Sequence, residues 1–397
     1  MVCSARLSIS LTNMTEQLRS STNSIRLLFL GCFETDRRIK SFARFFSRIG
    51  FQVEIIFAEP AKNTFRTWTD GGITFTQISL RRSSGPLMFL EYHRKLSKHL
   101  SSLSNSNITF ACDLYSLSVA RKVKKQGQAQ KVIYDARELY TELPTVASKP
   151  FVKLFWKLTE KRGLIVTDRI IVTAPLDADA IKNVHGFLPH SVLVRNLPEP
   201  SEEFEKSNYL RERYPVIGTR RILVYAGGLQ IDRGLEEMIV AMTNLQREYA
   251  FVIIGSGSLL PKLQEMVLMN GLETSVHFHE AVHSDQLPSI LSSADVGITL
   301  IKTDSGSYKL ALPSKVFEYM QAGLPILSSK LKQVISLFPN ESPIKYVEVS
   351  SDGILHGLKE LSFLSNDSDV RRNISQTANL RFSFDNDAHS LIPFLNA

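Results

Sequence analysis

The amino-acid sequence predicts an α/β protein with two domains, each built on a parallel sheet that helices cover on both faces. A length of 397 residues is too great for one ordinary domain. Short apolar runs alternate with helical patterns, which is typical of parallel sheets. The alternation stops in a proline-rich, acidic stretch and then starts again. We therefore expect a first domain at residues 25–198, a linker at 199–219 and a second domain at 220–380.

Within each domain, the strands are expected where apolar runs end at glycine or at polar residues. The run at residues 25–30 ends at Gly31, and the run at residues 222–226 ends at a pair of glycines. The other expected strands are residues 53–57, 108–111, 131–134, 169–172, 191–194, 251–254, 276–278, 296–300 and 325–327. A helix at residues 381–397 is expected to return to the first domain. Ligands are expected between the two domains, at the carboxyl ends of the strands.

The composition indicates where the protein works. Residues 1–24 are polar and lack a compact apolar segment, so we expect a disordered tail and no signal peptide. No apolar window is long enough to span a bilayer. The cysteines, Cys3, Cys32 and Cys112, have neither disulfide-framework nor zinc-site spacing, which predicts reduced thiols in a cytoplasmic protein.

The charge is unevenly distributed along the chain. Residues 1–198 contain 29 Lys and Arg against 15 Asp and Glu, whereas the remainder contains 18 against 24. A basic first half suits an acidic saccharide or an anionic lipid surface. Nucleic acid is not expected as a partner, because the sequence contains no nucleic-acid-binding motif.

The segment with the clearest chemistry is LPSKVFEYMQAGLPI, residues 312–326. Pro313 and Ser314 suit a helix start with Ser314 as the N-cap, and such a helix terminus can bind a phosphate. Glu318 lies one turn into the helix, where its carboxylate can accept two hydrogen bonds from a vicinal diol such as a ribose. The spacing alone fits equally well a charged helix that only packs on a sheet.

This segment resembles the donor-binding signature of the family 4 glycosyltransferases, in the branch that reads P-x-K-x-F-E-Y-x-x-A-G-x-P. That family has the GT-B fold, in which two Rossmann-like α/β/α domains face each other. Other segments that resemble the family are residues 134–140, 168–172, 194–198, 225–228, 233–234, 252–257 and 293–298. The resemblance covers about residues 25–397 and implies transfer of a sugar from a nucleotide-diphosphate sugar with retention of configuration.

The resemblance also implies a role for each matching residue: Glu318 would bind the donor ribose, Arg233 the diphosphate, and the loop that ends at Val282 would lie near the base. The catalytic candidates are Arg233, Arg137 and Glu138, the donor-binding candidates are Gly228, Arg233, Val282, Ser314, Lys315 and Glu318, and the candidates for the acceptor or phosphate side are Gly31 and Arg37. No cofactor or metal is expected, because the nucleotide sugar is a substrate and the cationic groups near its diphosphate would make a metal unnecessary.

Three positions depart from the family pattern. Leu310 stands where many members have a second Glu, which leaves recognition of the sugar open. Gly228 stands where a second basic residue is usual. Arg137 replaces a usual His, so a permanent cation that cannot act as a base stands where a titratable group is common. A non-catalytic nucleotide-sugar-binding subunit and a GT-B nucleotide-sugar epimerase therefore remain alternative functions.

Two further patterns are assigned to the fold and not to ligands. The Gly255-x-Gly257 sequence lacks the third glycine of a dinucleotide-binding fingerprint, so we expect a tight turn after a strand. His277, His279 and His283 have irregular spacing and no nearby cysteine, which argues against a zinc site.

The expected enzyme is a hexosyltransferase acting on a saccharide or lipid-linked acceptor in cell-surface polysaccharide or glycolipid synthesis, in the cytoplasm or on the inner face of the cytoplasmic membrane. A predicted helix at residues 149–162, with Pro150 in its first turn, bears on this location. One side carries Lys149, Lys153, Lys157 and Lys161, and the other carries Phe151, Leu154, Phe155 and Leu158. Either the aromatic side packs on the sheet and the lysines meet only water, or the lysines also bind an anionic membrane, which is the hypothesis we prefer.

Overall fold

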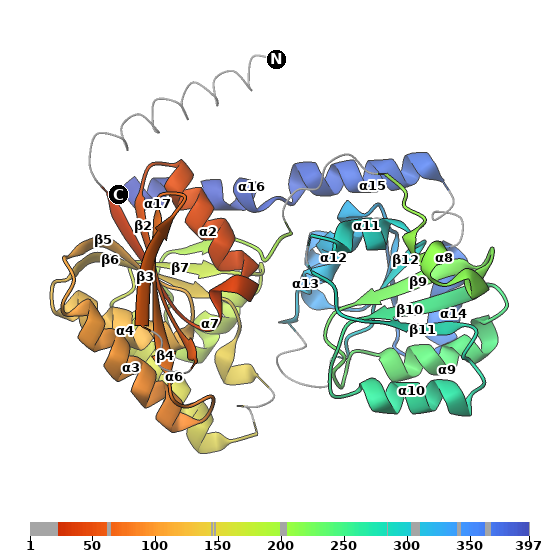
Figure 1. Ribbon diagram of the computed structural model, residues 1–397, viewed down its shortest axis with the longest axis horizontal. Helices are drawn as coiled ribbons and strands as arrows, with labels where there is room; N and C mark the ends of the chain where they lie inside the picture. Colours follow the sequence, from red (N-terminus) through yellow and green to blue (C-terminus); the bar gives the residue numbers. More distant parts are fainter. Residues whose placement is uncertain are drawn as a thin grey trace, which may run out of the picture. The chain divides into compact units, whose positions relative to one another are not determined.

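The computed structural model describes residues 23–61, 65–143, 146, 148–198, 205–283, 285–302, 310–339, 343–361 and 367–396. The chain divides into two compact units, each with helices on both faces of a sheet (Figure 1). The first unit comprises Met1–Arg195 and Asp387–Ala397, and the second comprises Asn196–Asn386. Residues 1–22 of the predicted tail lie outside the described residues.

The first unit is built on an eight-stranded sheet with the order β3-β4-β2-β1-β5-β6-β7-β8. Neighbouring strands pair in parallel except β3 with β4, which are antiparallel. The strands are β1 (Ser24–Leu30), β2 (Gln52–Pro60), β3 (Phe65–Asp70), β4 (Ile73–Leu80), β5 (Ser106–Ala111), β6 (Ala129–Ala136), β7 (Arg169–Val172) and β8 (Ser191–Leu193). The helices are η1 (Phe33–Thr35), α2 (Arg37–Arg48), α3 (Pro86–Leu100), α4 (Leu114–Lys125), η2 (Tyr140–Glu142), α6 (Pro150–Leu164), α7 (Asp177–His185), α16 (Phe384–His389) and α17 (Ile392–Asn396).

The β3–β4 hairpin is absent from the sequence prediction, and that omission was wrong. Gly71 and Gly72 have φ angles of 53° and 79°, and Asp70 pairs with Ile73 across them. Two consecutive positive φ angles are the mark of a two-residue hairpin turn. The signal was present in the sequence, because an Asp-Gly-Gly turn stands between two segments rich in Thr and aromatic residues.

The second unit contains a six-stranded parallel sheet with the order β11-β10-β9-β12-β13-β14. The strands are β9 (Arg221–Ala226), β10 (Tyr249–Ile254), β11 (Val276–His279), β12 (Val296–Thr299), β13 (Ile326–Ser329) and β14 (Ile344–Val347). The helices are α8 (Tyr209–Arg213), η3 (Pro215–Ile217), α9 (Leu235–Leu245), α10 (Leu260–Met269), α11 (Leu287–Ser292), α12 (Lys315–Gln321), α13 (Lys332–Leu337), α14 (Ser351–Leu361) and α15 (Ser368–Arg381). The sequence missed β14 but placed each of the other strands of this sheet.

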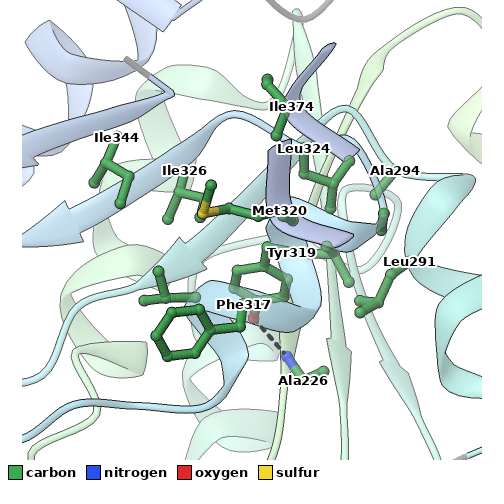
Figure 2. Packing of buried hydrophobic residues seen from close by; sticks show 14 of the residues in the cluster. Ala226, Leu291, Ala294, Phe317, Tyr319, Met320, Leu324, Ile326, Ile344 and Ile374 are labelled. Carbon is green, nitrogen blue, oxygen red and sulfur yellow. Dashed lines mark hydrogen bonds between the residues drawn. The ribbon is translucent and has the colours of Figure 1, made fainter. Parts of the chain in front are cut away.

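The side chains of β9 after Arg221 point alternately to the two faces of the sheet. Ile222 and Val224 belong to a hydrophobic cluster on one face, part of which is drawn in Figure 2. Leu223 and Tyr225 belong to a second cluster on the other face. Because helices cover both faces, the side chains from Ile222 to Ala226 are all buried, which is typical of parallel sheets.

The order of the strands fixes where a ligand can bind in the second unit. From β9 the chain continues to β10 and β11 on one side, and then crosses to β12 on the other side. The loops that follow β9 and β12 therefore leave in opposite directions, and in open α/β sheets ligands bind at the carboxyl ends of the strands at such a point. The segments singled out by the sequence, the loop after β9 and the helix α12, both lie in this part of the second unit.

Candidate functional site

The loop after β9 is shaped by glycines that touch neighbouring backbone. Gly227 has a φ of 141°, and a Cβ at Gly255 would lie 2.0 Å from the Gly227 carbonyl oxygen. These contacts support the interpretation of Gly255-x-Gly257 as a tight turn. Gly228 differs, because it is exposed and the nearest atom to an added Cβ would be 3.7 Å away. Its carbonyl accepts the Tyr225 hydroxyl at 2.8 Å, and the position has room for a side chain.

Arg233 lies half-buried in the same loop, directly before α9. Its neighbours Asp232 and Gly234 both have a positive φ, of 66° and 68°. A Cβ at Gly234 would lie 2.3 Å from the Leu300 carbonyl oxygen, and the Lys302 amide donates to the Asp232 carbonyl at 2.9 Å. The backbone around Arg233 is therefore held against the segment that follows β12.

Lys315 opens helix α12 and reaches this loop. Its Nζ lies 3.8 Å from the centroid of the Tyr225 ring and 3.1 Å from where a Cβ would stand at Gly227. Burial of the amine, together with repulsion from Arg233, lowers the pKa of Lys315 to about 7, while Glu318 acts in the opposite direction. Two cations and a carboxylate thus interact at one place, where an anion would relieve the repulsion between the cations.

The start of α12 differs from the prediction in one respect. Ser314 directly precedes the helix, as expected, but its hydroxyl makes no capping hydrogen bond. The reason is that its backbone is already helical, with φ −55° and ψ −29°, whereas a capping side chain needs an extended backbone. The Ser314 carbonyl accepts the amides of Phe317 and Glu318 at 2.9 and 3.1 Å, so the first turn is closed by the backbone alone. Glu318 and Leu310 are both half-buried.

Tyr319 fixes α12 to the sheet, a role that the sequence did not reveal. Its hydroxyl accepts the Ala226 amide at 3.0 Å, as drawn in Figure 2, and donates to the Ile298 carbonyl at 3.2 Å. Its ring lies against Gly297, where a Cβ would come within 2.4 Å of Cδ2. The helix is therefore tied to the ends of β9 and β12, which sets the positions of Lys315 and Glu318.

The histidines near β11 have structural partners. His279 is buried and shares hydrogen bonds with the Tyr209 hydroxyl at 3.0 Å and the Glu280 carbonyl at 2.8 Å. His277 stacks on Tyr214 with a centroid distance of 4.8 Å. Among the described residues, no three His, Cys, Asp or Glu side chains are grouped as metal ligands would be. Val282, in the loop that follows, is half-buried against the core of the second unit.

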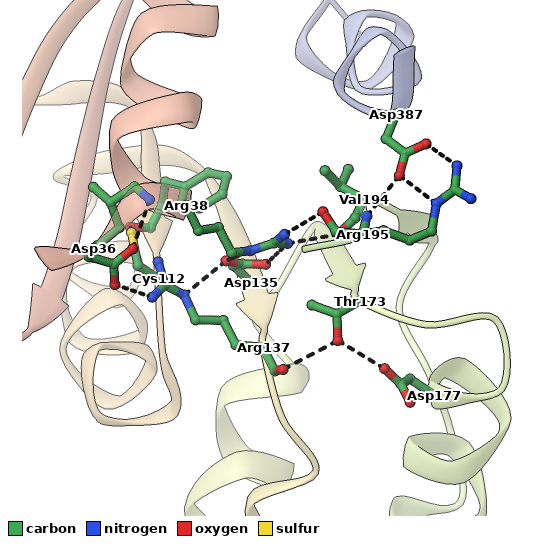
Figure 3. Close-up of polar contacts among 12 residues, drawn as sticks. Asp36, Arg38, Cys112, Asp135, Arg137, Thr173, Asp177, Val194, Arg195 and Asp387 are labelled. Atoms are coloured by element: carbon green, nitrogen blue, oxygen red, sulfur yellow. Dashed lines mark hydrogen bonds and ion pairs between the residues drawn. The ribbon is translucent and has the colours of Figure 1, made fainter. Parts of the chain in front are cut away.

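In the first unit, buried ion pairs gather near the carboxyl ends of β1 and β6 (Figure 3). Arg38 donates to both carboxylate oxygens of Asp135, at 2.8 and 2.6 Å, and to the carbonyls of Val194 and Arg195. The sequence singled out Arg37, which is exposed on the first turn of α2. It therefore missed that the neighbouring arginine is the one that faces inward.

Arg137 belongs to the same group of ion pairs. It contacts Asp36 through Nη1 and Asp135 through Nε at 3.2 Å, and these carboxylates raise its pKa against the opposing effect of burial. Arg137 is thus a fixed cation. Glu138 is exposed, yet desolvation by the surrounding chain raises the pKa of its carboxyl group. Gly31 ends β1 with a φ of 154°, and its amide donates to the Ala58 carbonyl at 2.9 Å.

Comparison with known proteins finds similarity in sequence for the second unit. Residues 207–379 match the family model "Glycosyl transferases group 1". WcaI of Escherichia coli, which is named as a glycosyl transferase of colanic acid biosynthesis, is 25% identical over 173 residues, 42% of each chain. Chitobiosyldiphosphodolichol beta-mannosyltransferase of Candida albicans is 26% identical over 207 residues, 48% of this chain and 44% of its own. The chain therefore spans less than half the length of these relatives.

Solved structures match both units. Sucrose-phosphate synthase from Thermosynechococcus elongatus covers 94% of this chain with 98% of its own, at a TM-score of 0.75 and 15% identity. HepE of Anabaena, solved in complex with UDP and glucose, covers 94% with 99% of its own, at a TM-score of 0.70 and 12% identity. These likenesses confirm the predicted fold class, GT-B, with two Rossmann-like α/β units.

Proposed function

We propose that this chain, a member of the group 1 glycosyltransferases through residues 207–379, moves a hexosyl group from a nucleotide-diphosphate sugar to a saccharide or lipid-linked acceptor. The observation that carries the proposal is the meeting of Lys315, Arg233 and Glu318 at the switch point of the second sheet. Two cations suit the two phosphates of the donor, and a carboxylate suits the hydroxyls of its ribose.

The chemical step follows from the charge that must be stabilised. The acceptor oxygen bonds to the sugar and its hydroxyl proton passes to a base, while the bond between the sugar and the diphosphate breaks and the departing diphosphate takes the electron pair and gains negative charge. Arg233 and Lys315 would neutralise that charge, and groups held rigidly for this purpose stabilise a transition state strongly. With two cations in place, the proposal needs no metal, so EDTA is expected to leave turnover unchanged.

The roles of the remaining candidates are part of the proposal. Val282 and its loop would contact the base, and Ser314 would contact a phosphate. On the first unit, Arg137 would hold an acceptor or phosphate oxygen and would not act as a base, since its charge is fixed by ion pairs. We assign the acceptor side to Gly31 and Arg37. Glu138 is the first-unit carboxyl that we propose to exchange a proton, because desolvation raises its pKa above the ordinary value of a glutamate.

The wider setting is inferred from the relatives. One of them is named for colanic acid biosynthesis and another for a mannosyl transfer to a dolichol-linked substrate. We propose that this chain also acts in the synthesis of a cell-surface polysaccharide or glycolipid, on the cytoplasmic side of a membrane. Retention of the anomeric configuration is proposed on a different ground, the resemblance of residues 312–326 to the donor-binding signature of the family 4 glycosyltransferases.

A donor-binding assay tests the function directly. A thermal-shift screen of UDP- and GDP-sugars would identify the donor, because a bound ligand raises the melting temperature. Two charge-assisted hydrogen bonds to the ribose are worth about 1.5–3 kcal/mol each. Glu318→Gln should therefore weaken binding at least about tenfold. Glu348→Gln, at a side chain that is 75% exposed, is the matched control and should bind like the wild type.

Product analysis then separates the proposed reaction from its rivals. NMR of the product should show the anomeric configuration of the donor. Formation of an isomeric nucleotide sugar without an acceptor would replace the proposal with an epimerase. Binding of the donor with no turnover on any acceptor would indicate a non-catalytic subunit. Leu310 and Gly228 favour this alternative, because both depart from the family pattern.

A further inference from the structure

The outer face of helix α6 is apolar and exposed. Phe151, Leu154, Phe155 and Leu158 expose 89%, 53%, 59% and 41% of their surface. We call these four side chains the α6 outer face. The alternative drawn from the sequence, that this side packs on the sheet, is therefore wrong. Isolated exposed apolar residues are ordinary, but four on one face of one helix indicate an interaction surface.

Three other residues decide which side of α6 faces inward. A Cβ at Gly163 would lie 2.4 Å from Cγ of Leu117 on α4, so the glycine lets the two helices approach closely. Glu160 is buried and accepts hydrogen bonds from the Tyr134 hydroxyl at 3.0 Å and His185 at 2.9 Å. With Trp156, these residues make up the buried side. At about 100° per residue, the α6 outer face points away from the core.

The charges beside this face are positive. The lysines at 149, 153, 157 and 161, with Arg162, give this stretch five cations, and its acidic residue, Glu160, is buried. Lys161 and Arg162 are exposed, whereas Lys153 is tied to Glu142 at 2.9 Å. The exposed surface of the helix is therefore an apolar strip with a cationic border.

A neighbouring helix also exposes apolar side chains. Phe89, in the first turn of α3, contacts Trp156, near the middle of α6, edge-on at a centroid distance of 5.1 Å. On either side of Phe89, Leu87 and Leu90 expose 57% and 66% of their surface. Within the described residues, every helix is too short or too polar to cross a bilayer.

We propose that the α6 outer face inserts into the headgroup region of an anionic membrane. An amphipathic helix that binds in the interface buries its apolar face between lipids and uses Lys and Arg to contact anionic headgroups. A second copy of the chain fits less well, because a two-fold contact through this face would bring the cationic borders of both copies together. Lysines alone would hold the protein on the surface of the membrane. Because the four apolar side chains of the α6 outer face point farthest from the core, we expect them to enter the headgroup region as well.

Flotation of the whole chain with vesicles tests this proposal. Vesicles of phosphatidylglycerol and phosphatidylcholine should bind the wild type, and part of that binding should persist at high salt, where attraction between exposed charges is screened. Phe151→Ser combined with Phe155→Ser should lower partitioning at least about tenfold and remove the salt-resistant part. Lys157→Gln combined with Lys161→Gln should remove mainly the salt-sensitive part.

The control is a matched apolar pair elsewhere. Leu268 and Met269 of α10 expose 67% and 78% of their surface, and changing both to Ser should leave vesicle binding unchanged. If the phenylalanine variant were poorly folded by circular dichroism, the serine variants of Leu154 and Leu158 would replace it. The proposal is refuted if the wild type ignores anionic vesicles, or if the outer-face variants bind as the wild type does. A dimer that ignores vesicles and dissociates in these variants would refute it as well. None of these outcomes bears on donor binding, which needs no membrane.

Discussion

The lowered pKa of Lys315 predicts that donor binding takes up a proton. In the free protein, burial and the nearby Arg233 lower the pKa of this amine to about 7. A diphosphate placed beside the amine favours its charged form and raises the pKa again, by roughly 1–3 units for a close opposite charge. Affinity should therefore fall as the pH rises through 7 toward the higher pKa of the complex.

The size of the effect can be estimated from these two pKa values. With a pKa of about 7 in the free protein and about 9 in the complex, the amine is roughly one-tenth protonated before binding and nine-tenths after binding at pH 8. Binding at this pH would then take up about 0.8 of a proton, and affinity would fall about fifty-fold between pH 6 and pH 9. That loss corresponds to about 2.3 kcal/mol.

Isothermal titration calorimetry in buffers of different ionisation enthalpy measures both quantities. The ligand should be a nucleotide-diphosphate sugar, because its phosphates carry no proton that titrates in this range. Lys315→Met should bind weakly at every pH and without proton uptake. Lys315→Arg keeps its charge at high pH, so its affinity should depend little on pH. The reasoning fails if the wild type shows neither proton uptake nor weaker binding between pH 6 and pH 9.

Three further predictions concern single residues. Arg233→Ala should lower turnover in a steady-state assay roughly a hundredfold. Arg233→Lys should recover part of that turnover, since lysine keeps the charge and loses only the bidentate geometry. Unchanged turnover in the alanine variant would remove Arg233 from the reaction. Gly228→Arg should tighten donor binding severalfold in calorimetry, because the position is exposed and has room for a side chain; weaker binding would show that the loop needs the glycine. Asp387→Ala should lower the free energy of unfolding, measured by urea titration, by about 3 kcal/mol. The reason is that Arg195 loses a carboxylate that it contacts at 2.6 Å. Asp369→Ala is the control and should change the free energy of unfolding little, because the Asp369 side chain is 81% exposed.

Sequence patterns predicted most of the fold because the strands of a parallel sheet are apolar runs. Burial on both faces makes residues 222–226 of β9 a continuous run without a charged side chain, and such a run can be recognised without its partners. The hairpin of β3 and β4 is the exception, because its Asp-Gly-Gly turn is a local signal that interrupts the alternation of strands and helices. The candidate donor-site residues come from the family signature, since spacing alone leaves the role of α12 open.

What the sequence could not predict were orientations set by distant partners. Neighbours on a helix point about 100° apart, so nothing local decides between Arg37 and Arg38. The decision comes from Asp135, which lies far along the chain and binds Arg38 through both oxygens. The orientation of α6 stays open in the sequence for the same reason, because the buried Glu160 finds its partners on other elements. A hydrophobic pattern then suggests the wrong side as the buried one.

The environments of the cations also separate structural charges from those available to a ligand. Arg137 sits between Asp36 and Asp135, which raise its pKa, so the fold already supplies its counter-charges. Lys315 is in the opposite situation, because burial and Arg233 drive it toward neutrality and its nearby carboxylate does not compensate. A buried amine held in this way gains most from an anion that arrives from outside. Arg137, which stands where the resembling family usually has His, therefore forms fixed ion pairs in the first unit, whereas Lys315 in the second unit is the cation that we propose to respond to a substrate.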